Sequence, residues 1–138
     1  MGQVKVKIDV VNWADMQLSA KGYIPSDKIR RLELDALVDT GAASLNLPVS
    51  VIEKLGLIKA DERIIRTANG TVTRKVYAGA WVTILGRSHI FGVVELPDDC
   101  PPLIGVVVLE ELDLVPNPTK ETLEPNPAHG GEWTSYAY

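Results

Sequence analysis

A single carboxylate stands at the end of an apolar strand, and this position constrains the rest of the chain. Residues 31–38 alternate between polar and apolar side chains, which is the period of a strand with one face in the core. Asp39 follows a strand predicted at 29–38, and Gly41 then lets the backbone turn sharply or approach another backbone closely. Since Asp and Gly also favour ordinary solvent-exposed turns, the tripeptide Asp39-Thr40-Gly41 needs support from its flanks.

The flanking sequence gives that support. Apolar residues precede the tripeptide, and residues 42–47 continue as Ala-Ala-Ser-Leu-Asn-Leu. Far downstream, Leu103-Ile104-Gly105 leads into a short helix predicted at 106–112. These two motifs, in this order and with a hairpin between them, resemble those of the retropepsin-like aspartic proteases. The resemblance covers about residues 4–125 and looks like a cellular, bacterial-type, single-domain branch of that family.

The resemblance implies an all-β fold with one or two short helices: a closed β-barrel that is half of a two-lobed aspartic protease. It implies a protease domain at 1–125 and a tail at 126–138, loose or in contact with a partner subunit. The tail contains the aromatic residues Trp133, Tyr136 and Tyr138.

The same resemblance assigns roles to individual residues. Asp39 would be catalytic, Thr40 would hydrogen-bond across a dimer axis, Gly41 would admit the substrate backbone, and Ala42 would line the floor of the cleft. Leu103, Ile104 and Gly105 would pack beneath this loop. Two positions depart from the retroviral pattern, because Ala43 stands where an acid is usual and Val106 stands where a polar residue is common.

The remaining elements follow from periodicity and turn residues. Strands are predicted at 3–11, 44–47 and 122–124, and a helix begins at Pro48 and ends at Gly56. Residues 13–21 fit a helix capped by Asn12 or an irregular loop. The stretch 51–57 is echoed by 108–114, which fits an internal repeat, although any short amphipathic helix looks similar.

Two hairpins are predicted between the motifs. Asn69-Gly70 is a strong hairpin turn between residues 63–68 and 71–77, and a second hairpin at 81–96 turns near Gly86-Arg87. The first hairpin occupies the place of the family's flap, the strand pair that closes over a bound peptide. This assignment of Asn69 and Gly70 rests on order alone, and an ordinary surface hairpin fits the residues equally well.

One acid per chain predicts two chains. Peptide hydrolysis by carboxylates requires two of them, and the other acids are expected on wet strand faces, helix surfaces or loops. A twofold axis would bring Asp39 of each subunit together, and two adjacent carboxylates would share one proton. The predicted function is therefore an aspartic endopeptidase acting on peptides or proteins as a homodimer. The alternative is a non-catalytic dimer that binds peptides.

Other chemistries have little support. His89, His129 and Cys100 show no ligand spacing, so neither a metal nor a cofactor is expected. The formal net charge of −4 argues against nucleic acid, and Lys28, Arg30 and Arg31 are expected on the wet face of a strand. The start of the chain does not lead us to expect a signal peptide, and no apolar run approaches the ~20 residues of a membrane helix, so the default expectation is a cytoplasmic protein that does not bind membranes.

Overall fold

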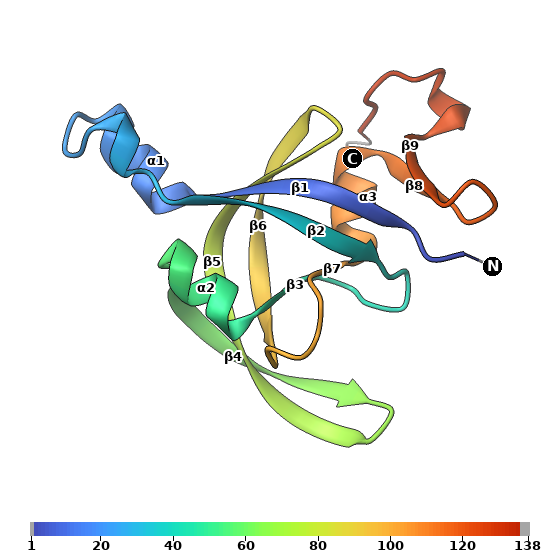
Figure 1. Cartoon of the computed structure of the whole chain (residues 1–138), viewed down its shortest axis with the longest axis horizontal. Coiled ribbons are helices and arrows are strands. Elements are labelled where there is room, and N and C mark those ends of the chain that lie inside the picture. Colours follow the sequence, from blue (N-terminus) through green and yellow to red (C-terminus); the bar gives the residue numbers. More distant parts are fainter. Residues whose placement is uncertain (1, 136–138) are drawn as a thin grey trace.

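Six strands close into a barrel in the computed structural model, which describes residues 2–135 (Figure 1). The strand order is β1-β2-β7-β3-β6-β5-β4, and pairing of β1 with β5 closes the ring, leaving β4 outside it. The strands are β1 (Lys5–Asn12), β2 (Arg31–Val38), β3 (Leu45–Pro48), β4 (Ile58–Thr67), β5 (Gly70–Ile84), β6 (Arg87–Leu96), β7 (Leu103–Ile104), β8 (Leu114–Asn117) and β9 (Thr122–Pro125). This arrangement confirms the predicted retropepsin-like barrel.

Aliphatic side chains fill the barrel. Alternation along β1 buries Ile8 and Val10, whereas Lys5 remains exposed, because successive side chains of a strand point to opposite faces. The fully buried set comprises Ile8, Leu45, Leu47, Ile52, Leu55, Ile84, Ile104, Leu112, Val10, Val82, Val93 and Val108. It draws on strands and helices from the whole chain, so the barrel has one continuous core.

The short strand β7 joins the two motifs seen in the sequence. It lies between β2 and β3, parallel to β2 and antiparallel to β3. Leu103 is paired with Leu37 and Ile104 with Val38. The downstream motif therefore lies directly beside the strand that ends at Asp39.

Two predicted hairpins share one long strand. β5 pairs with β4 through its first half and with β6 through its second half, with an irregularity between Tyr77 and Ala80. The β4–β5 hairpin projects below the barrel on the same side as the β2–β3 loop (Figure 1). Its turn is Ala68-Asn69, because Thr67 is paired with Gly70. The predicted Asn69-Gly70 turn was thus one residue too late: Gly70 carries the positive φ of 115° instead of sitting in the centre of the turn.

Three short α-helices cover the barrel: α1 (Trp13–Ala20), α2 (Val49–Leu55) and α3 (Val106–Leu112), with single 3₁₀ turns η1 (Ser26–Lys28) and η2 (Pro127–His129). The helix alternative for 13–21 is confirmed, since Asn12 Oδ1 accepts a hydrogen bond from Asp15 N at 2.9 Å. None of the helices in residues 2–135 is long and apolar enough to cross a membrane.

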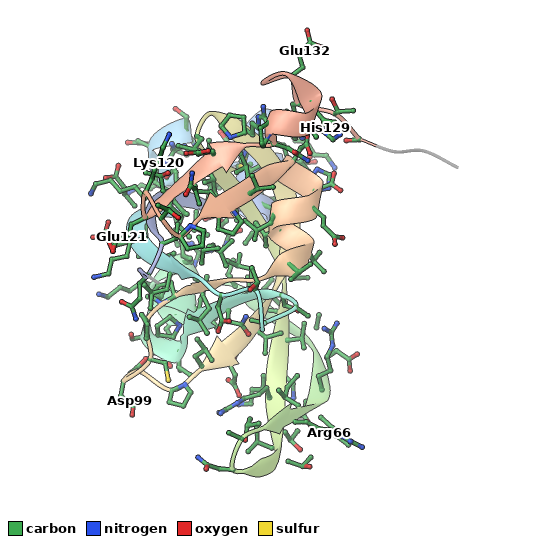
Figure 2. All side chains as sticks on the ribbon, turned by 90° about the vertical axis from the view of Figure 1, so that its right-hand side faces the viewer. Arg66, Asp99, Lys120, Glu121, His129 and Glu132 are labelled. Atoms are coloured by element: carbon green, nitrogen blue, oxygen red, sulfur yellow. The ribbon has the colours of Figure 1, made fainter. Side chains whose placement is uncertain are left out.

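The C-terminal part of the described chain packs on α3. β8 and β9 form a separate two-stranded sheet, and η2 lies above α3 with His129 turned toward it (Figure 2). Trp133 Nε1 donates to Glu111 O of α3 at 2.9 Å. Trp133 is thus bound within its own chain, whereas Tyr136 and Tyr138 lie outside the described residues.

Candidate active site

Asp39 is the first residue after β2, and its backbone continues the sheet. Its N–H donates to Ile104 O at 2.9 Å, and its carbonyl accepts from Ala42 N at 3.1 Å. The carboxylate Oδ1 accepts from Gly41 N at 2.9 Å, and Asp39 is exposed. The acid is therefore presented to solvent on a loop whose first residue is fixed by the neighbouring strand.

The predicted loop residues lie together around this carboxylate. Thr40 and Gly41 are exposed, and Ala42 is half-buried. A Cβ added to Gly41 would lie 3.2 Å from Asp39 Oδ1, so a side chain at this position would crowd the acid. The loop thus keeps one face of the carboxylate clear.

Gly105 lies directly beneath the loop. A Cβ at this position would fall 2.5 Å from Ser44 O and 2.7 Å from Ala42 O. Since real Cβ atoms do not approach backbone oxygens so closely, only glycine fits without moving the loop. The predicted packing of 103–105 under the catalytic loop has this close approach as its physical reason.

The first turn of α3 binds the same loop through hydrogen bonds. Gly105 N donates to Ser44 O, Val106 N to Ala42 O, and Val107 N to Ala43 O, each at 2.9 Å. These N–H groups have no acceptor within their own helix, so the loop carbonyls satisfy them. The contact uses only backbone atoms, which explains why an apolar residue is acceptable at position 106.

A cavity of about 280 Å³ connects the end of this loop to the hairpin. It is lined by Ser44, Leu45, Arg63, Val76, Phe91, Gly92, Val94 and Val107. A larger cavity of about 790 Å³ lies between α3, β8 and residues 126–135, and it reaches the loop at Thr40. The smaller cavity is the better candidate for substrate side chains because it lies between the loop and the hairpin.

The structure separates the predicted hairpin residues from this cavity. Asn69 and Gly70 are exposed at the hairpin tip and do not line it. The hairpin residues that do line it are Arg63 and Val76, which sequence reasoning had not singled out. No local signal in the sequence would have identified them, because the position of the hairpin over the cavity is set only by the folded structure.

Two buried acids correct the expectation that every other acid is solvated. Asp15 forms an ion pair with Arg30, with Arg30 Nε to Asp15 Oδ2 at 2.8 Å, and this hydrogen bond lowers the pKa of Asp15. Arg30 is therefore not simply on a wet strand face. Asp113 Oδ2 is 2.6 Å from His129 Nδ1, and this hydrogen bond lowers the pKa of Asp113.

These pairs have structural rather than catalytic geometry. The Asp15 carboxylate also accepts from Arg30 N, and that of Asp113 also accepts from Thr134 N and Asn126 Nδ2, so the oxygens of both acids are engaged by their own chain. Across residues 2–135, no three His, Cys, Asp or Glu side chains converge as a metal site would require.

Comparison with known proteins supports the motif assignment. A family model described as aspartyl protease matches residues 27–107, more than half of the chain and the part that contains both motifs. A search of curated proteins found no match. The match, the closed barrel and the loop geometry agree, and the chain belongs to the retropepsin-like aspartyl protease family.

Proposed function

We propose that this protein is an aspartic endopeptidase that acts as a homodimer, with Asp39 of each subunit forming the catalytic pair. The observation that carries the proposal is a single exposed acid on a loop fixed from below by Gly105 and α3. The two buried acids, Asp15 and Asp113, are engaged by Arg30 and His129. A twofold axis passing near the loop would supply the second carboxylate.

The chemistry follows from two carboxylates that share one proton, for which aspartic proteases are the standard example. The ionised Asp39 takes a proton from a water molecule, whose oxygen attacks the carbonyl carbon of the peptide. The protonated Asp39 of the partner gives its proton to the carbonyl oxygen. Collapse of the tetrahedral intermediate then breaks the C–N bond as a proton passes to the amine.

The fixed loop supports this mechanism because catalytic groups must be held close to their productive geometry. The peptide would lie between the loop and the β4–β5 hairpin, with Ala42 on the floor and Asn69 and Gly70 at the tip above it. Thr40 would donate a hydrogen bond across the axis. Gly41, which carries no side chain, would leave room for the substrate backbone.

The test is hydrolysis of a peptide library at pH 4 to 6 by the wild-type protein and by Asp39→Asn. Cleavage by the wild-type protein that disappears in the variant is the expected result, with an optimum on the acid side because one proton must be retained by the pair. Equal activity in both proteins, or a rate that rises steadily to pH 9, would refute the mechanism.

Sedimentation tests the dimer separately. A dimer is expected at micromolar concentration and at the pH of the assay. Thr40→Ala should weaken the dimer while leaving the thermal unfolding of the subunit nearly unchanged, and an unchanged dimer affinity would refute the role given to Thr40.

A further inference from the structure

We infer that Arg63 and Arg74, on the inner face of the β4–β5 hairpin, form a site for an acidic side chain of the peptide. This inference rests on the proposed function, since it names a substrate preference of the same cleft. It starts from the pairing of the hairpin, in which Arg63 lies directly opposite Arg74.

The pairing places these two residues on the face that looks toward the body of the protein. Arg63 and Arg74 share that face with Ile65, Val72 and Val76, of which the last is buried and the other two are half-buried. The opposite face carries Ile64, Arg66, Thr71 and Thr73, all exposed. The two arginines are on the same face as these buried side chains, with Arg74 half-buried and Arg63 exposed.

The cavity of about 280 Å³ gives this inner face a binding site. Arg63 and Val76 line it from the hairpin, and Ser44 and Leu45 line it from the end of the catalytic loop. Arg74 does not line the cavity, so a peptide side chain placed there would contact Arg63 first, with Arg74 opposite Arg63 on the neighbouring strand.

Two like charges directly opposite each other on a sheet destabilise the hairpin. Asp61 is on the same face, opposite Val76, but it forms no ion pair with either arginine among the described residues. Within residues 2–135, neither guanidinium makes a hydrogen bond or an ion pair. The surrounding carboxylates are engaged elsewhere: Glu62 with Lys59 Nζ at 2.7 Å, Asp61 with Glu62 N at 2.8 Å, and Glu95 with Lys75 N at 3.1 Å.

The charge around the cleft favours an anion as the missing partner. Residues 63–75 carry four cations and no acid, although the whole chain has a net charge of −4. Residues 40–46 of the catalytic loop and β3 are all uncharged. Because arginine binds carboxylates through charge-assisted hydrogen bonds, a Glu or Asp side chain of the peptide fits this pair.

The experiment measures binding, so that it does not depend on turnover. An array of decapeptides is probed with the Asp39→Asn dimer, and each Glu-containing peptide is compared with its Gln counterpart. At one position along the bound peptide, Glu should bind about five- to tenfold more tightly than Gln, and 0.5 M salt should reduce the preference by screening.

Variants identify the residues responsible. In the same Asp39→Asn background, Arg63→Gln with Arg74→Gln should abolish the preference, and Arg63→Glu with Arg74→Glu should reverse it in favour of Lys. Arg66→Glu is the matched control, because Arg66 is on the outer face and points away from the molecule in Figure 2. Circular dichroism establishes that each variant is folded.

The results separate this inference from the proposed function. Equal binding of Glu and Gln peptides, loss of the preference in Arg66→Glu, or no binding of any peptide would overturn the acidic site. Cleavage of the same array by the wild-type protein tests the protease separately. A binding preference for Glu without Asp39-dependent cleavage would refute the protease and support the acidic site. Asp39-dependent cleavage without a binding preference would support the protease and refute the acidic site.

Discussion

Helices α2 and α3 have similar sequences and end in the same way, but different contacts hold their ends. Both have seven residues, and both end at a residue with a left-handed backbone, Gly56 (φ 63°) for α2 and Asp113 (φ 54°) for α3. A buried leucine follows each terminator. The sequence echo between 51–57 and 108–114 thus corresponds to a structural one.

Side chains from distant strands satisfy the last carbonyls of both helices, but with different chemistry. Asn12 Nδ2 donates to Leu55 O at 2.8 Å and to Gly56 O at 3.3 Å. Arg87 Nη1 donates to the corresponding two carbonyls of α3 at 2.9 Å each, and Arg87 Nη2 reaches Gly131 O at 3.0 Å. The arginine that satisfies the end of α3 therefore also binds the C-terminal segment, whereas the asparagine at the end of α2 makes no hydrogen bond to the described part of that segment.

The helix beginnings differ more. In the first turn of α2, Ser50 N donates to Asp98 Oδ1 at 2.8 Å. At the start of α3, the backbone N–H groups donate to carbonyls of the catalytic loop. Two helices of the same length and pattern therefore have different roles. Helix α2 packs Ile52 and Leu55 into the core, whereas α3 is hydrogen-bonded to the Asp39 loop at its start and to the C-terminal segment, through Arg87, at its end.

The largest expected effect comes from Gly105→Ala. The added methyl group would meet backbone atoms that cannot rotate away, so we expect a loss of about 3 kcal/mol in the free energy of unfolding, together with loss of peptide hydrolysis. Gly22→Ala is the comparison, because Gly22 also has a left-handed backbone (φ 80°) and an added Cβ there would meet nothing within 4 Å. There we expect about 1 kcal/mol from the left-handed φ.

Urea unfolding and peptide cleavage measured on both variants would test this difference. If Gly105→Ala cost no more than Gly22→Ala and kept full activity, the hydrogen-bonded contact between α3 and the Asp39 loop would not be required for stability or activity, contrary to this prediction.

Arg87→Met should have the second largest effect. It keeps most of the apolar stem but leaves the buried Leu112 O and the exposed Gly131 O without this donor. Asp113 O keeps Asn126 N as a donor at 3.0 Å, so the expected cost is about 2 to 3 kcal/mol. Residues 126–134 should also become more accessible to proteases, since Arg87 binds Gly131 and lies 5.9 Å from the Trp133 ring centroid. Asn12→Ala should cost about 2 kcal/mol without exposing that segment, and equal proteolysis of the two variants would contradict this assignment.

The comparison also shows which features the sequence could predict. Alternation and the turn residues predict the individual strands and hairpins, because these depend on local periodicity and backbone preferences. The closed barrel and the place of Gly105 beneath the loop were implied by the resemblance that the two motifs carry. The two buried acids were missed, because Asp15 and Asp113 resemble any polar residue at a helix start or end. Their partners, Arg30 and His129, come close only after folding.

The inner arginines were missed for a related reason. A turn centred on Asn69-Gly70 would place Arg63 opposite Val76, whereas the observed turn at Ala68-Asn69 places it opposite Arg74. A shift of one residue in a turn changes every pair in the hairpin. The predicted turn therefore missed the direct Arg63–Arg74 pair, although both registers put the two arginines on one face. That this face lines the cavity depends on how the hairpin packs against the barrel, which local turn preferences do not fix.

Asp113→Asn should change the pH dependence of stability. The folded-state pKa of Asp113 is lowered, chiefly by its hydrogen bond with His129, so its contribution is present above the unfolded-state value and is lost as the pH falls through the folded-state value. The wild-type protein should exceed the variant in unfolding free energy at pH 6, and the difference should shrink below about pH 4.

Urea titrations at pH 3, 4 and 6 would measure this difference. Gly22→Ala provides the control, because an added Cβ there would meet nothing within 4 Å and its cost, which comes from the left-handed φ of 80°, should not depend on pH. A difference for Asp113→Asn that stayed constant over this range would show that the carboxylate contributes through shape rather than charge.

Asp98→Ala should have the smallest effect and tests whether the start of α2 is independent of the site. It removes the acceptor for Ser50 N in an exposed position, which should cost about 0.5 to 1 kcal/mol in the free energy of unfolding. Peptide hydrolysis should be unchanged, because α2 makes no hydrogen bond to the catalytic loop among the described residues. Asp99→Ala is the matched control, since Asp99 points into solvent in Figure 2 and accepts only a weak contact from Cys100 Sγ at 3.8 Å. A fall in hydrolysis for Asp98→Ala but not for Asp99→Ala would mean that α2 also supports the catalytic loop, and the division of roles between the two helices would fail.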